Sequence, residues 1–163
     1  MIHIYTGDGK GKTTAAVGLA VRAAASGKKV LFFQFLKSDT GNERKSLTKL
    51  DNIMVLNIGE EIPFLFNVDD EKKGYYKRLY TEKINSIYQH DFDMFIFDEA
   101  VTAINLGIIS ENNIFKFSDF GELVITGRGD ITNFKDKCDY ITIMQKEKHP
   151  YDKGIAGRSG IEY

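Results

Sequence analysis

The chain has 163 residues, the usual size of one compact domain, so we expect a single domain over 1–163. Apolar residues make up 42% of the chain and charged residues 28%, which excludes wholesale disorder. The formal net charge of −1 gives no broad basic field for nucleic acid, and the apolar runs are too short to cross a membrane. We therefore expect neither nucleic-acid nor membrane partners. The single cysteine, Cys138, cannot form a disulfide within the chain, so we expect a cytoplasmic protein.

Strand-like and helix-like segments alternate along the chain. Runs rich in β-branched and aromatic residues predict strands at 2–6, 29–36, 53–58, 93–98, 122–127 and 140–145. The segments between them predict helices at 13–26, at about 69–90 and near 131–137, and further helical segments between the strand at 93–98 and about residue 117. Pro63 and Pro150 are both expected in loops. This alternation predicts an α/β fold, a mostly parallel central sheet flanked by helices on both faces.

The first predicted strand runs directly into a glycine-rich loop at 6–14, TGDGKGKTT. Such a loop points backbone N–H groups at phosphate oxygens, and the helix that follows adds its partial positive charge. Lys12 would neutralise the phosphates, and the Thr13 hydroxyl would bind Mg²⁺. A merely tight turn would explain the glycines but not Lys12 and Thr13 together. The residues expected to bind a polyphosphate here are Thr6, Gly7, Asp8, Gly9, Lys10, Gly11, Lys12, Thr13 and Thr14.

This loop is one residue shorter than the common phosphate loop, in which four residues separate the first glycine from Gly-Lys-Ser/Thr. Only three residues separate Gly7 from Gly11. A shorter loop holds the phosphates differently, so the motif alone does not establish transfer of the γ-phosphoryl group.

Two acidic residues end the predicted strand at 93–98. Asp98 and Glu99 follow the apolar run MFIF, at the carboxyl edge where open α/β sheets bind ligands. They resemble a Walker B element and could hold Mg²⁺ opposite Thr13. The alternative is an acidic pair that only favours the start of a helix.

Two cations are expected at the same edge. Arg128 follows the strand at 122–127 and could bind phosphate or substrate, or form a surface ion pair. Lys37 follows the strand at 29–36, and a solvated lysine explains it equally well.

Taken together, the motifs resemble those of the ATP:corrinoid adenosyltransferases of the CobA/CobO/BtuR type. The residues that carry the resemblance are YTGDGKGKTTAA at 5–16, QFLK at 34–37, GNER at 41–44, DE at 98–99, ITGRG at 125–129 and KHPYDKGIAGRSGIEY at 148–163. The resemblance implies a RecA-like P-loop fold. It also implies transfer of the 5′-deoxyadenosyl group from MgATP to the Co(I) of a corrinoid, cobalamin or cob(I)yrinic acid a,c-diamide, with release of triphosphate, in cobalamin biosynthesis or salvage.

The resemblance further implies roles for individual residues. Lys12, Thr13 and Glu99 would be catalytic and would stabilise the departing triphosphate, with support from Asp98 and Arg128. Thr13, Asp98 and Glu99 would hold the Mg²⁺ ion.

An aromatic segment contacts the corrin ring in this family. The best matches here are Phe64 and Phe66, in IPFLFNVDD, although two Phe at alternate positions could equally be buried hydrophobic residues.

The resemblance also implies a homodimer and, by analogy, a flavoprotein reductant. The chain departs from the family in beginning at the first strand, and in reading GRSGIEY where the family more often has Ala-Gln before Gly-Ile-Glu. The alternative functions are a P-loop ATPase or nucleotide kinase, and a regulator that binds ATP or a corrinoid without turnover.

Overall fold

The computed structural model describes residues 1–38, 41–60, 69–87 and 91–162. Within them, six strands form one sheet in the order β3-β2-β4-β5-β1-β6, and every strand pair is parallel. The strands are β1 Ile2–Thr6, β2 Val30–Gln34, β3 Ile53–Leu56, β4 Met94–Asp98, β5 Glu122–Thr126 and β6 Tyr140–Ile143. The α/β fold class predicted from the sequence is confirmed.

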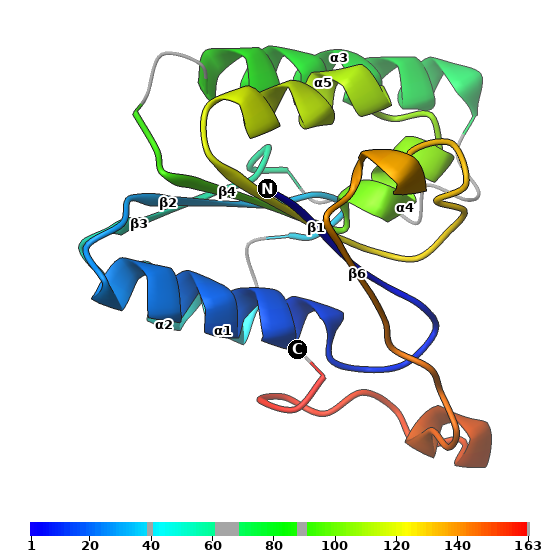
Figure 1. Cartoon of the computed structure of the whole chain (residues 1–163). Helices are drawn as coiled ribbons and strands as arrows, with labels where there is room; N and C mark the ends of the chain where they lie inside the picture. Colours follow the sequence, from blue (N-terminus) through cyan, green and yellow to red (C-terminus); the bar gives the residue numbers. More distant parts are fainter. Residues whose placement is uncertain (39–40, 61–68, 88–90, 163) are drawn as a thin grey trace.

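Helices cover both faces of the sheet (Figure 1). On one face lie α1 Lys12–Ala25 and α2 Asn42–Leu47, and on the other lie α3 Asp70–Ile87, α4 Ala100–Asn105 and α5 Glu111–Phe115. Short 3₁₀ turns are η2 Lys116–Asp119, η3 Lys135–Lys137 and η4 Pro150–Lys153. Among the described residues, no helix combines the length and the hydropathy needed to cross a membrane.

Alternate residues of the central strands build two separate cores. In β2, Val30 and Phe32 belong to the core beneath α1, whereas Leu31 and Phe33 belong to the core beneath α3 and α4. All four side chains are fully buried. Successive side chains of a strand point to opposite faces, so a strand covered on both faces must be apolar throughout. This requirement explains the continuous apolar runs of the sequence.

The structure differs from the sequence predictions at several places. The helix α2 was not predicted, because its polar sequence NERKSL has only Leu47 in the core. The helix predicted near 131–137 is reduced to η3, because the Asp130 carboxylate accepts hydrogen bonds from the Thr132 backbone and hydroxyl and forms a turn there. Pro150 opens η4 instead of lying in a loop.

The strand predicted at 29–36 ends at Gln34, because the backbone turns two residues later. Leu36 has a φ of 55°, a left-handed conformation that a branched side chain rarely adopts. Its N–H donates to the hydroxyl of Tyr80 at 2.8 Å instead of to a neighbouring strand. Tyr80 is fully buried on α3, and burial raises the pKa of its hydroxyl. A buried side chain therefore fixes where the chain leaves the sheet.

We expect Tyr80→Phe to lower the free energy of unfolding by about 1–2 kcal/mol, because the Leu36 N–H would lose its partner. Tyr75→Phe is the matched control, since the Tyr75 hydroxyl donates to Glu60 at an exposed position. Its cost should be at most about 0.5 kcal/mol. Urea denaturation of the two variants measures the difference, and equal costs would contradict a structural role for the Tyr80 hydroxyl.

Candidate functional site

The glycine-rich loop after β1 packs against the segment that follows β6. The Gly9 N–H donates to the Met144 carbonyl at 2.7 Å, and a Cβ atom on Gly9 would lie only 2.7 Å from that same oxygen. Gly7 and Gly11 have φ values of 103° and 114°, in the region that favours glycine. The glycines therefore serve the packing and turns of the loop itself, in addition to leaving its N–H groups accessible to phosphate.

The Lys12 side chain is folded into the loop. Its ammonium donates to the carbonyls of Gly7 at 2.8 Å and Gly9 at 2.6 Å, and the residue is 6% exposed. Burial, and then repulsion by Arg128, lowers the pKa of Lys12 from its usual value. A buried cation beside Gly11, where α1 begins, is the arrangement that attracts a polyphosphate.

The other predicted loop residues have different surroundings. Thr6 is buried at the end of β1, whereas Lys10 and Thr14 are exposed. Asp8 accepts a hydrogen bond from the Lys146 N–H at 3.0 Å, which lowers the pKa of the Asp8 carboxyl. Asp8 therefore helps to hold the loop against the segment after β6.

Asp98, the last residue of β4, is fully buried. Its Oδ1 accepts from the hydroxyl of Thr126, at the end of β5, at 2.6 Å, and from the hydroxyl of Thr13, in α1, at 2.9 Å. Strand β5 is the neighbour of β4 in the sheet, so the threonine at its end lies beside Asp98. The structure thus brings together Thr13 and Asp98, as the sequence predicted.

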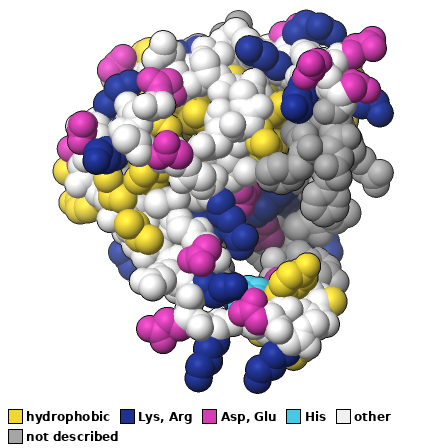
Figure 2. Space-filling model, turned by 90° about the vertical axis from the view of Figure 1, so that its right-hand side faces the viewer, with side chains coloured by type: hydrophobic (Ala, Val, Ile, Leu, Met, Phe, Trp, Pro, Cys, Tyr) yellow, Lys and Arg dark blue, Asp and Glu magenta, His cyan; other side chains and the backbone are white. Residues whose placement is uncertain are grey.

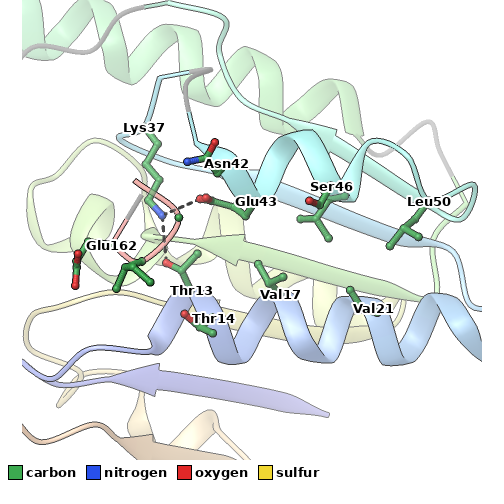
Figure 3. A pocket seen from close by; sticks show the side chains of 13 residues that line it. Thr13, Thr14, Val17, Val21, Lys37, Asn42, Glu43, Ser46, Leu50 and Glu162 are labelled. Atoms are coloured by element: carbon green, nitrogen blue, oxygen red, sulfur yellow. Dashed lines mark hydrogen bonds and ion pairs between the residues drawn. The ribbon is translucent and has the colours of Figure 1, made fainter. Parts of the chain in front are cut away.

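Lys37 belongs to the same cluster. Its ammonium donates to Asp98 Oδ2 at 2.8 Å and to the Thr13 hydroxyl at 3.1 Å, and it lies 3.6 Å from Glu43 Oε1. Figure 3 shows Lys37 reaching across to α1 and α2. Burial tends to lower the pKa of Lys37, but Asp98, Glu43 and Glu99 together outweigh burial and the pKa is raised. Lys37, which the sequence alone could also explain as a solvated lysine, is thus part of the site.

Sequence reasoning missed the contributions of Gln34 and Glu43. The Gln34 amide donates to Glu43 Oε1 at 2.9 Å and to Asp98 Oδ2 at 3.4 Å. Gln34 is fully buried at the end of β2, and a buried polar residue within an apolar strand was the signal that could have revealed it. Glu43 was singled out only as part of the family motif GNER at 41–44, and the helix that carries it was not predicted.

Glu99 lies beside the cluster in a strained conformation. Its φ of 61° is left-handed, and its N–H donates to the Thr126 hydroxyl at 3.0 Å. Its Oε2 accepts from the Thr102 hydroxyl at 2.7 Å. That same hydroxyl accepts from the N–H of Arg128, so Thr102 connects the two predicted site residues. The Arg128 residue itself is exposed.

The donor set fits a hydrated magnesium ion. Thr13 and Asp98 present oxygen atoms side by side, and the Oε1 of Gln34 is a buried acceptor without a hydrogen-bond partner in the described part of the chain. Mg²⁺ prefers oxygen ligands and keeps several waters, which could donate to such acceptors. Within the described residues, no group of three or more His, Cys, Asp or Glu is placed to hold a metal. Phosphate oxygens and waters therefore have to complete the coordination.

A pocket of about 380 Å³ adjoins the cluster, between α1, α2 and the C-terminal tail. Thr13 and Lys37 lie at its inner end, Val17 and Val21 on the α1 side, and Glu162 in the tail (Figure 3). Figure 2, which looks onto the carboxyl edge of the sheet, shows basic and acidic side chains around a hollow. The predicted corrinoid residues Phe64 and Phe66 lie outside the described residues.

Comparisons with known proteins point to one family. A family model described as ATP:corrinoid adenosyltransferase BtuR/CobO/CobP matches residues 1–163. The corrinoid adenosyltransferase of Escherichia coli strain K12 and corrinoid adenosyltransferase CobA of Salmonella typhimurium strain LT2 are each 27% identical over 177 residues. Each alignment covers 100% of this chain and 85% of the relative. The Pseudomonas aeruginosa corrinoid adenosyltransferase is 26% identical, with 100% and 83% covered.

A solved structure supports the fold. The chain resembles EssC (ATPases 2 and 3) from Geobacillus thermodenitrificans with a TM-score of 0.52 and 11% sequence identity. The similarity covers 98% of this chain and 34% of that one. A likeness at such low identity shows the fold alone, and that fold is consistent with a P-loop NTPase architecture.

We expect Gly9→Ala to weaken ATP binding and to lower the free energy of unfolding by about 1–3 kcal/mol, because the new methyl group meets the Met144 backbone. Gly18→Ala, in α1, is the control, since nothing lies within 4 Å of a Cβ there. It should stabilise the helix by about 0.5–1 kcal/mol. Calorimetric titration with ATP and thermal unfolding measure both effects. Unchanged ATP affinity in the Gly9 variant would contradict this account of the loop.

Proposed function

Because the chain belongs to the ATP:corrinoid adenosyltransferase family, we propose that it transfers the 5′-deoxyadenosyl group from MgATP to the Co(I) of a corrinoid and releases triphosphate. The acceptor would be cobalamin or cob(I)yrinic acid a,c-diamide, in cobalamin biosynthesis or salvage. The observation that supports this most directly is the juxtaposition of the buried Lys12 ammonium with the Thr13–Asp98 pair at one edge of the sheet.

The reaction requires no nucleophile from the protein. The electron pair of Co(I) attacks the 5′-carbon of ATP, a Co–C bond forms, and the bond between that carbon and the α-phosphate oxygen breaks. Triphosphate leaves with the electron pair of the broken bond. The chain therefore has to align the two substrates and to stabilise the negative charge that develops on the leaving group.

The phosphate loop supplies that stabilisation. Lys12, now bonded to the Gly7 and Gly9 carbonyls, would exchange those partners for phosphate oxygens without leaving the loop. The N–H groups at the start of α1 would add their partial positive charge. Burial lowers the pKa of Lys12 most, and charge repulsion by Arg128 lowers it further, so Arg128 contributes to the same electrostatic field.

A Mg²⁺ ion would be held by the Thr13 hydroxyl, with Asp98 and Glu99 binding through water. When bound, it would neutralise the charge on the triphosphate. Asp98 orients the Thr13 hydroxyl through the hydrogen bond at 2.9 Å. Glu99 follows Asp98 directly in the chain. Its carboxylate accepts from the Thr102 hydroxyl, which in turn accepts from the Arg128 N–H, so the Glu99 side chain is held near Arg128.

The proposal includes three features that the sequence resemblance implies and supports: contact between the corrinoid and Phe64 and Phe66, a homodimer, and a flavoprotein reductant. It also includes a single domain over 1–163, which the chain length supports, and a cytoplasmic location, which the single cysteine supports.

The decisive experiment is anaerobic incubation with MgATP and reduced cob(I)alamin, following the corrinoid spectrum and assaying triphosphate. We expect stoichiometric adenosylcobalamin and triphosphate, and a loss in kcat of about 100-fold or more for Lys12→Ala, because the leaving group loses its buried cation. Lys49→Ala, at an exposed position after α2, is the matched control and should retain activity. ADP release would indicate an ATPase or kinase, and binding without turnover would indicate a regulator.

We expect Thr13→Val to weaken Mg²⁺-dependent activity while preserving shape, because valine lacks the hydroxyl oxygen that is offered to the metal. Thr81→Val is the control, since the Thr81 hydroxyl only donates to a carbonyl of its own helix. The Mg²⁺ concentration for half-maximal activity should rise about tenfold in the first variant. An identical Mg²⁺ dependence in both variants would remove Thr13 from the metal site.

A further inference from the structure

The Lys37 ammonium lies where the site would receive a metal cation. It donates to Thr13 Oγ1 at 3.1 Å and to Asp98 Oδ2 at 2.8 Å. Thr13 and Asp98 are the residues whose oxygens are proposed to hold Mg²⁺, directly and through water. The Lys37 ammonium thus occupies the contacts with Thr13 and Asp98 that a bound metal cation would use.

The fold holds Lys37 in this position. The residue before it, Leu36, has the left-handed φ of 55°, and its N–H is tied to the buried Tyr80 hydroxyl. Phe35 is fully buried and packs against the Tyr80 ring, with centroids 4.9 Å apart. The backbone is therefore fixed just before Lys37, while the side chain beyond it can rotate about its own bonds.

A second anion lies within reach of the same ammonium. Glu43 Oε1 is 3.6 Å from Lys37 Nζ (Figure 3). The Gln34 amide donates to that oxygen at 2.9 Å. The ammonium can therefore leave Thr13 and remain beside a carboxylate. Without this alternative, leaving would strand a partly buried charge.

The Lys37 ammonium and a metal cation cannot occupy the site at Thr13 and Asp98 at the same time, because both are positively charged. Asp98 is fully buried, so it requires a cation or hydrogen-bond donors at all times. Two cations on the same partly buried oxygens would repel each other strongly. A metal that enters the site must therefore displace Lys37.

We propose that Lys37 is a positioning residue that acts as a resident counter-cation. It holds Thr13 and Asp98 in place before the metal–nucleotide complex binds, and it shifts towards Glu43 and the phosphates when that complex enters. The inference rests on the proposed function for the identity of the complex. Glu43 already lies beside the Lys37 ammonium and cannot by itself make up for the lost contact with Asp98, and Mg²⁺ alone brings no phosphate that would do so. The site therefore admits the metal together with the nucleotide and resists the metal by itself.

The test measures thermal unfolding of the full chain without nucleotide, over a series of MgCl₂ concentrations, for the wild type and Lys37→Met. The wild-type midpoint should hardly respond to Mg²⁺. The variant should have a lower midpoint without metal and should regain it as Mg²⁺ is added, with an apparent affinity about tenfold or more above that of the wild type. Lys137→Met is the matched control, since it removes a lysine from the surface ion pair with Glu111.

Two further variants keep the test decisive. Lys37→Arg retains the positive charge and should remain insensitive to Mg²⁺. Lys37→Gln keeps a hydrogen-bond donor for Asp98 without the charge, so it should fold even if the Met variant does not and should respond to Mg²⁺. An equal Mg²⁺ response in the wild type, Lys37→Gln and Lys37→Arg would overturn the proposal. The assay contains neither ATP nor corrinoid, so failure of adenosyl transfer and failure of this inference are separate results.

Discussion

The buried carboxylate of Asp98 is the constraint on which the site depends. A fully buried carboxylate is stable only when donors or cations satisfy its oxygens, and here the donors come from α1, β5, the end of β2 and the turn after β2. Segments distant in sequence are thereby held around one group. Because β4 and β5 are neighbours in a parallel sheet, their carboxyl ends meet at the same edge and Thr126 can reach Asp98.

A second contact system holds the phosphate loop. The loop lies between β1, from which it emerges, and the segment after β6, which meets Gly9 through Met144 and Asp8 through Lys146. This packing leaves no room for a Cβ atom at Gly9. The conformation of the short loop is therefore determined by the segment after β6 as well as by its own glycines. In that conformation the loop surrounds the Lys12 ammonium.

The fold and the chemistry have separate physical origins. A sheet with helices on both faces needs only strands that are apolar throughout, and the likeness to EssC at 11% identity shows that very different sequences meet this need. The chemistry of the site depends instead on the polar cluster at the edge of the sheet. Gln34, Lys37 and Glu43 add to the phosphate loop a charge network that the fold itself does not require.

The sequence by itself determined the strands, the phosphate loop and the proximity of Thr13 to Asp98, because these follow from local patterns and from the shared carboxyl edge of parallel strands. The roles of Phe64 and Phe66 remain predictions. The sequence also placed Lys37 at this edge, but only the tertiary structure decided the contacts that Lys37 and Glu43 make there. A left-handed turn at Leu36, fixed by a hydroxyl from distant α3, directs Lys37, and no local pattern encodes a contact made 44 residues away.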